Sequence, residues 1–166
     1  MFELKRLSKE ALPRALEKAE RYRLLNEPWQ AESICRDVLE TDPGNQEALV
    51  ILLLSLTDQF EHGMADYAKQ ARQAVPRLRS EYEQAYYTGI ICERQAKAHL
   101  HQRAHGTGYI AYQWLGEAMR SYEKAEAIRP HGNDDAILRW NTCARMIMSD
   151  PRIAPMPEGR VEAMME

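Results

Sequence analysis

The sequence predicts an all-α fold in which pairs of helices stack into a solenoid, and three observations support this prediction. Apolar side chains recur at the spacing of amphipathic helices along most of the chain. Clusters of Pro, Gly and Asn separate these stretches. A pattern of small and aromatic residues occurs twice, with intervals of four, three and five residues each time. The two copies are Ala31, Cys35, Val38 and Pro43, and Ala118, Tyr122, Ala125 and Pro130.

The first copy of this pattern extends backwards to Ala19 and Tyr22. It then contains a small residue, an aromatic residue three positions later, an alanine, a medium-sized residue and a proline, which is most of the tetratricopeptide pattern. The chain thus resembles the tetratricopeptide repeat family. This resemblance implies a right-handed α-solenoid of helix-turn-helix repeats that acts as a binding scaffold, and it leaves the partner unidentified.

Residues 8–43 form the expected first repeat. The spacing of its apolar side chains predicts a first helix over residues 8–25, with Ser8 as the N-cap that accepts backbone N–H bonds. A break follows, and Pro28 suits the first turn of a second helix because its missing N–H has no helical partner there. This second helix is expected over residues 28–40.

Residues 45–79 form the expected second repeat. Asn45 is placed to cap a helix that ends near residue 60 and is apolar nearly all round. A helix of this kind belongs in the middle of a stack, where it has neighbours on several sides. A more polar helix is expected over residues 64–78, and Pro76 predicts that its last turn is irregular.

Residues 80–130 form the expected third repeat, which is longer than the others. A capping box at Ser80-x-x-Glu83 begins a helix that continues to about residue 103, and a glycine turn separates it from a second helix over residues 109–128. The prolines of the two pattern copies are 87 residues apart, which exceeds two periods of 34 residues. The third repeat is therefore predicted to be an elongated hairpin with helices of roughly 20 to 24 residues that project beyond their neighbours.

A single closing helix is expected over residues 133–148, beginning at Asn133, because the last repeat of a stack needs a helix to cover its exposed face. The repeats and this helix make one predicted domain, residues 1–149. Residues 150–166 contain three prolines and little periodicity, which indicates a tail that is flexible or irregularly docked.

Composition narrows the class of protein. The net charge of −3 does not indicate a polyanion-binding protein of the strongly basic kind. Cys35, Cys92 and Cys143 are far apart and lie at inward helix positions, so we expect reduced core cysteines rather than disulfides or a zinc site. Neither a signal peptide nor a membrane span is apparent, and we expect a cytoplasmic protein.

The inner surface of the first helix of each repeat is the first candidate site. The resemblance implies that fixed repeat positions point into a concave groove, where apolar anchors next to Arg23, Arg94 and Arg145 would suit a peptide with hydrophobic side chains and carboxylates. Alternatively, these arginines are solvated or paired with Glu20 and Glu93 on their own helices. The predicted groove residues are Leu16, Glu20, Arg23, Val50, Leu54, Asp58, Tyr86, Ile90, Arg94, Asn141 and Arg145.

Residues 94–116 form a second candidate, a hairpin arm without Asp or Glu. Cations interleaved with aromatic residues can bind RNA or another polyanion, although three permanent positive charges are few and nucleic acid is the weaker alternative. The arm could instead dock a partner protein, form a homodimer or have only a structural role. The predicted arm residues are Lys97, His101, Arg103, His105, Tyr109, Tyr112 and Trp114.

Signals for a metal site or for catalysis are weak. His101 and His105 have the spacing of ligands on one helix face, but a third ligand is missing and no metal is expected. Asp134 and Asp135 are adjacent, so on a helix they point about 100° apart, which is poor geometry for paired acid and base catalysis. The sequence therefore predicts a non-catalytic protein-interaction scaffold without a cofactor, and not an enzyme.

Overall fold

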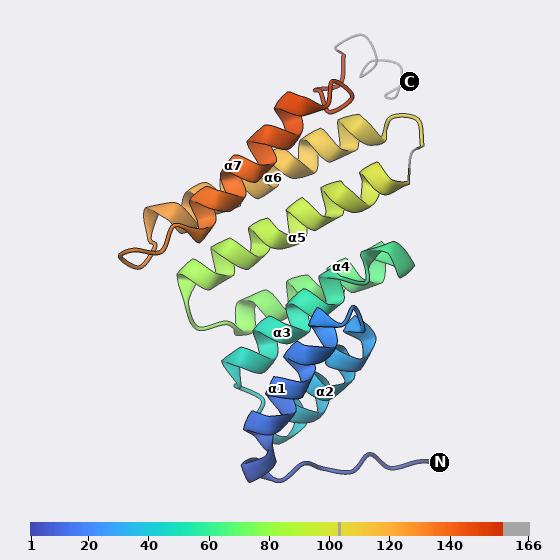
Figure 1. Cartoon of the computed structure of the whole chain (residues 1–166), viewed down its shortest axis with the longest axis vertical. Helices are drawn as coiled ribbons and strands as arrows, with labels where there is room; N and C mark the ends of the chain where they lie inside the picture. The colour runs from blue at the N-terminus through green and yellow to red at the C-terminus, as the bar shows by residue number, and fades with distance from the viewer. Residues whose placement is uncertain (103, 158–166) are drawn as a thin grey trace. The chain divides into compact units, whose positions relative to one another are not determined.

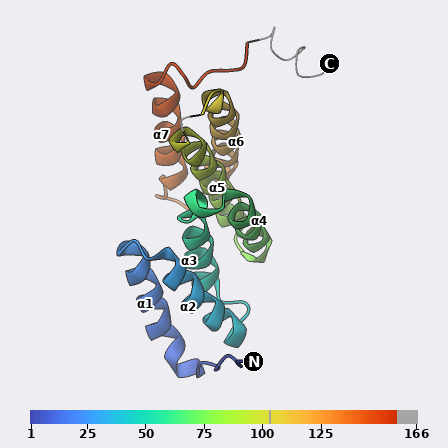
Figure 2. The same ribbon diagram turned by 90° about the vertical axis from the view of Figure 1, so that its right-hand side faces the viewer.

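The computed structural model describes residues 1–102 and 104–157. Within those ranges the chain forms seven α-helices and three short 3₁₀ helices and contains no β-strand, which confirms the all-α prediction. The chain divides into two compact units, an N-terminal unit (Met1–Ser80) and a C-terminal unit (Glu81–Glu166), which are described separately. Within each unit, every helix packs against the next one along the chain (Figures 1 and 2).

The N-terminal unit consists of two antiparallel helix pairs, in which α1 also contacts α3. Its α-helices are α1 (Leu12–Leu24), α2 (Pro28–Thr41), α3 (Gln46–Thr57) and α4 (Met64–Ala74). Its 3₁₀ helices are η1 (Lys9–Ala11), η2 (Phe60–His62) and η3 (Val75–Arg77).

The start of α1 differs from the prediction. Ser8 precedes the 3₁₀ turn η1 and its side chain makes no capping hydrogen bond, so Ser8 as N-cap of a helix from residue 8 was wrong. Pro13 explains the difference: an α-helix that began at Ser8 would need an N–H at position 13 to bond the carbonyl of Lys9, and proline has none. The α-helix therefore begins at Leu12, with Pro13 in its first turn.

The ends of α3 and α4 follow from local residue chemistry. The Asn45 side chain accepts a hydrogen bond of 2.9 Å from the N–H of Ala48, which confirms Asn45 as the N-cap of α3. The predicted irregular turn at Pro76 is also confirmed, because α4 ends at Ala74 and the chain continues as η3. By contrast, α3 stops at Thr57, before the predicted end near residue 60.

The C-terminal unit contains α5 (Glu81–His101), α6 (Thr107–Ala127) and α7 (Asp135–Ser149). Helices α5 and α6 each have 21 residues, which confirms the predicted helix lengths of the elongated hairpin. Gly106 joins them with a φ of 81°, a left-handed conformation that glycine adopts without strain. Helix α7 packs against α6 (Figure 1).

The recurring sequence pattern occupies equivalent core positions in the two units. The first three residues of each copy lie on the second helix of an antiparallel pair, α2 or α6, and their side chains are fully buried. The buried residues are Ala31, Cys35 and Val38 on α2, and Ala118, Tyr122 and Ala125 on α6. The alanines and Cys35 allow the neighbouring helices to approach closely, whereas the large ring of Tyr122 packs against Gly89 of α5.

The turns after the two copies are also alike. Pro43 and Pro130 are both exposed and follow the second helix of their pair. In each turn an asparagine side chain, Asn45 or Asn133, accepts a backbone N–H at the start of the next helix. The turn after Pro130 is two residues longer than the turn after Pro43, because α3 begins three positions after Pro43 and α7 begins five positions after Pro130. The buried positions of these two helices correspond when the offset between the copies is increased by one residue.

Cys35, Cys92 and Cys143 are buried free thiols, as the sequence predicted. Burial raises the pKa of Cys35 and of Cys143 to about 12, so both thiols stay protonated at neutral pH. Thiols of this kind are core residues of low reactivity.

The chain after α7 lies against the start of α6. Ile153 is buried, and a Cβ atom placed on Gly108 would lie 2.1 Å from the carbonyl oxygen of Arg152, so glycine is required for this close approach. Residues 150–157 are therefore irregularly docked. Residues 158–166 of the predicted flexible tail lie outside the described residues.

Candidate partner-binding surfaces

The predicted groove residues of the N-terminal unit come from α1 and α3, which contact each other. Leu16 is buried in the core and therefore does not face a partner. The other five, which are Glu20, Arg23, Val50, Leu54 and Asp58, are half-buried.

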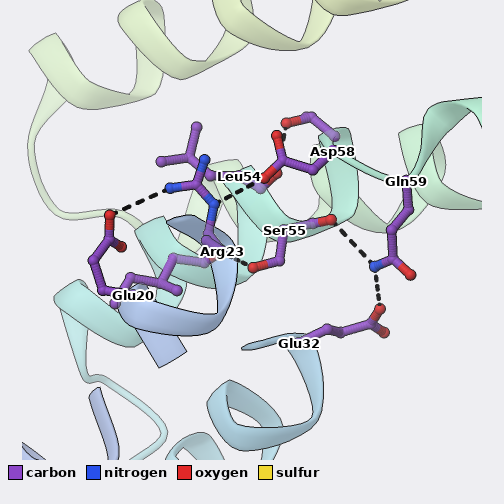
Figure 3. A network of polar contacts seen from close by, with 9 residues as sticks. Glu20, Arg23, Glu32, Leu54, Ser55, Asp58 and Gln59 are labelled. Atoms are coloured by element: carbon purple, nitrogen blue, oxygen red, sulfur yellow. Dashed lines mark hydrogen bonds and ion pairs between the residues drawn. The ribbon is translucent and has the colours of Figure 1, made fainter. Parts of the chain in front are cut away.

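Arg23 joins α1 to α3 through two carboxylates (Figure 3). Its Nε donates to Asp58 Oδ2 at 2.9 Å, and its Nη1 lies 3.6 Å from Glu20 Oε1 on the same helix. The Arg23 and Asp58 side chains are only 15% and 21% exposed, which limits screening of this pair by water. Arg23 is therefore paired with carboxylates, which was the second of the two alternatives for the arginines. The charge at this position is negative because two carboxylates face one guanidinium.

A second polar network links α2, α3 and the turn after α3 (Figure 3). Gln59 Nε2 donates to Glu32 Oε2 at 2.7 Å and to the Ser55 carbonyl oxygen at 3.1 Å. Arg36 donates to Glu32 at 2.7 Å and to Gln70 of α4 at 2.6 Å. Sequence reasoning missed this network. Polar residues within and directly after an otherwise apolar helix were its only signal, since buried polar groups need hydrogen-bond partners.

The predicted groove residues of the C-terminal unit lie on α5 and α7. Ile90 is a core residue, because its side chain is buried. Tyr86, Arg94 and Asn141 are half-buried, and Arg145 is exposed.

A buried carboxylate, that of Glu93, is the electrostatic centre of the C-terminal unit. Glu93 is 1% exposed and accepts a hydrogen bond of 2.7 Å from the Tyr122 hydroxyl. Lys97 Nζ also donates to Glu93, and Arg139 Nη1 of α7 lies 3.3 Å from it. A buried charge is tolerated only when it is paired and hydrogen-bonded, and here one hydroxyl and two cations satisfy it. The sequence offered only the four-residue spacing of Glu93 and Lys97 as a signal for this cluster.

Tyr122, the hydroxyl donor to this carboxylate, belongs to a cluster of tyrosine rings. The ring of Tyr86 lies with its centroid 5.9 Å from that of Tyr122 and 5.2 Å from that of Tyr87. Burial, followed by the nearby Glu83 carboxylate, raises the pKa of Tyr87 to about 12. Burial and the Glu93 carboxylate raise the pKa of Tyr122 well above its ordinary value. Tyr87 and Tyr122 therefore remain uncharged at neutral pH, and the Tyr122 hydroxyl acts as a hydrogen-bond donor.

Two features of the predicted hairpin arm are corrected by the structure. Lys97 is bound to Glu93, so this cation is already paired with a carboxylate that lies just outside the acid-free segment. His101 is the last residue of α5 and His105 lies in the following turn, so the two histidines do not share a helix face. Gly106, in a left-handed conformation, is the N-cap residue of α6.

The remaining arm residues differ in exposure. His105 is exposed, and Tyr109, Tyr112 and Trp114 are half-buried. Arg103 lies outside the described residues. Among residues 1–102 and 104–157, no group of three or more His, Cys, Asp or Glu side chains could hold a metal ion.

Two further observations concern membrane spans and similarity to known proteins. No helix in the part of the chain that the structure describes combines the length and the apolar character that crossing a membrane requires. Comparison of the chain with protein-family models, curated proteins and solved structures gave no match.

Proposed function

We propose that this chain is a non-catalytic protein-interaction scaffold built from tetratricopeptide-like repeats in a right-handed solenoid, and that it acts in the cytoplasm on a partner peptide or protein. The observation that supports this proposal is the equivalence of the two antiparallel helix pairs. Three pattern positions are fully buried in both pairs, and similar Pro and Asn turns follow them. Repeated helical pairs present extended surfaces for binding.

The surface of α1 and α3 is the proposed binding face of the N-terminal unit. Val50 and Leu54 are four residues apart, so both lie on the same face of α3, and both are half-buried. Glu20 and Asp58 place two carboxylates around the single guanidinium of Arg23 next to Leu54 (Figure 3). This charge balance favours a peptide that combines apolar side chains with a basic group.

Selection of peptides on the immobilised protein tests the proposal. Peptides from a random phage-displayed library are expected to contain apolar residues and Lys or Arg, and to lose binding when Leu54 is replaced by Arg. Leu24→Arg is the matched control because Leu24, the last residue of α1, is 80% exposed. If the selected peptides bind wild type and the Leu54→Arg variant equally well, the assignment of this face is wrong.

A further inference from the structure

A groove runs along α6 and α7 in the C-terminal unit, and no helix among residues 81–102 and 104–157 covers it. At one end, a hollow of about 730 Å³ is lined by residues that include Tyr112, Met119 and Ile147. Nearer the turn between the two helices, a hollow of about 300 Å³ is lined by residues that include Ile137 and Trp140. We call these two hollows the α6/α7 groove.

The corresponding helices of the N-terminal unit, α2 and α3, are covered by α4. Helix α4 packs against α3, and its buried residues are the three alanines Ala68, Ala71 and Ala74. The hydrogen bond from Arg36 of α2 to Gln70 of α4 shows that α4 also reaches α2. A third helix therefore contacts both members of the pair in this unit.

Core positions confirm that α2 and α3 correspond to α6 and α7. In addition to the pattern residues on α2 and α6, two positions of α3 match two of α7 once the longer turn is taken into account. Ala48 and Ser55 on α3 correspond to Ala136 and Cys143 on α7, and all four are fully buried.

The same correspondence identifies positions that are covered in one unit and open in the other. Leu49 and Leu52 of α3 are buried, whereas their counterparts Ile137 and Trp140 of α7 are half-buried and line the α6/α7 groove. A polar pair of the N-terminal unit is replaced by an apolar pair. Glu32 and Gln59 are hydrogen-bonded to each other, whereas Met119 corresponds to Glu32 and Ile147 corresponds to Gln59. Met119 and Ile147 line the larger hollow of the groove. Within the described part of the C-terminal unit, apolar surface thus remains exposed where the N-terminal unit has a helix.

We infer that the α6/α7 groove binds a basic amphipathic helix of a partner protein, which occupies the position that α4 has in the N-terminal unit. The length of α4, 11 residues, sets the expected contact at about three helical turns. The apolar face of the partner helix covers Ile137, Trp140 and Ile147. Its recognition follows the helix-in-groove mode, in which apolar anchors recur at three- and four-residue spacing.

Charge complementarity specifies the polar side of this partner. Glu117, Glu123 and Glu126 line the groove, and Arg120 is the one cation among its lining residues within the described chain. Arg120 is bound to Glu117 at 2.7 Å, so an excess of carboxylates remains to attract Lys or Arg. Residues 158–166 of this chain carry three Glu and one Arg, so their net charge is negative, like that of the groove, and does not complement it.

This inference rests on the repeat equivalence that underlies the proposed function, but it concerns a different surface from the α1/α3 face. A probe peptide tests it directly. The probe is a fluorescein-labelled helical peptide of about 15 residues with Leu and Ala on one face and Lys on the other. A second peptide has the same apolar face and Glu at every Lys position.

Ile147→Arg places a cation in the groove, and Leu138→Arg is its matched control on the same helix because Leu138 is 63% exposed and does not line either hollow. The lysine peptide is expected to bind wild type and Leu138→Arg alike, and Ile147→Arg more weakly by about tenfold or more. The glutamate peptide is expected not to bind. Circular dichroism establishes that each variant folds.

A second variant keeps the test informative if Ile147→Arg does not fold. Glu126→Lys on α6 should weaken the lysine peptide and reduce the salt dependence of its binding, whereas Glu17→Lys on the exposed surface of α1 should not. In a Trp29→Phe background, binding should also change the fluorescence of Trp114 and Trp140, which line the groove.

Three results would overturn the inference. They are equal binding of the lysine peptide to wild type and to the groove variants, equal binding of the two peptides, and self-association of the wild type that Ile147→Arg abolishes. The last result would assign the groove to a second copy of this chain. Loss of selected peptides in Leu54→Arg is measured separately, so failure on the α1/α3 face and failure at the α6/α7 groove are distinguishable.

Discussion

Gly89→Ala tests whether α5 and α6 pack as the structure describes. A Cβ atom at position 89 would lie 2.4 Å from Tyr122 Cε1 and 2.7 Å from Cδ1, distances that real Cβ atoms do not reach. Tyr122 is fully buried and its hydroxyl is fixed on Glu93, so the ring cannot move without losing this hydrogen bond. The added methyl group therefore has two opposing effects on stability: it favours the helical backbone, and it clashes with the Tyr122 ring.

The magnitudes decide which effect is larger. Replacing Gly by Ala inside a helix gains about 1 kcal/mol of stability. Overpacking of a core costs roughly 1–3 kcal/mol, and loss of a hydrogen bond to a charged group costs about 1.5–3 kcal/mol. Gly89→Ala should therefore lower the free energy of unfolding by about 3 kcal/mol, as the difference of these contributions. Urea unfolding followed by circular dichroism measures this change.

Two second-site variants locate the cause. In a Tyr122→Phe background the ring remains, so Gly89→Ala should still be destabilising. In a Tyr122→Leu background the clashing Cε1 atom is absent, and the same substitution should become neutral or stabilising by up to about 1 kcal/mol. Gly116→Ala on α6 is the matched control because its Cβ would meet only Arg120 Nη1 at 3.7 Å, so it should be stabilising. An equal cost of Gly89→Ala in the Leu and Phe backgrounds would refute the packing argument.

Three other predictions follow from single contacts. Asn45→Ala should lower the free energy of unfolding by about 1 kcal/mol, measured by urea unfolding, because the first-turn N–H of Ala48 loses its acceptor. Cys35 and Cys143, which are buried and have pKa values of about 12, should react with a thiol reagent at pH 8 far more slowly in the folded protein than in urea. Stability should fall as the pH rises from 10 to 12, because Tyr87 keeps its proton up to about pH 12 when folded but releases it near 10 when unfolded. A smaller fall in Tyr87→Phe would confirm the source.

Local signals in the sequence were sufficient for most helix boundaries. The cap at Asn45, the breaks around the prolines and the lengths of the long helices depend on residues that are close in the sequence. Ser8 was a wrong N-cap although the reason, Pro13, lies only five positions away. Ser8 and Pro13 were both assigned to the same helix, but the missing N–H at position 13 is compatible with a start at Leu12 and not with a start at Ser8.

The electrostatics of the C-terminal unit could not be predicted in the same way. Glu93 meets Tyr122 and Arg139, which lie 29 and 46 positions later in the sequence. Composition along the chain described Lys97 as part of an acid-free basic arm, whereas in three dimensions it is bound to a buried carboxylate one helical turn earlier. Charge counted over a segment therefore predicts binding to a polyanion only when the fold leaves the cations unpaired.

A comparison of α3 with α7 shows how the number of apolar faces on a helix relates to the number of helices that contact it. Helix α3 is apolar nearly all round because α1, α2 and α4 contact it. Helix α7 has two fully buried positions, Ala136 and Cys143, yet it retains Ile137 and Trp140 where α3 has buried leucines. Both side chains are only half-buried, so each leaves apolar surface that a covering helix would remove from water. Their presence is therefore better explained by a covering helix, and the carboxylates of Glu123 and Glu126 on the adjacent helix indicate that this helix is basic.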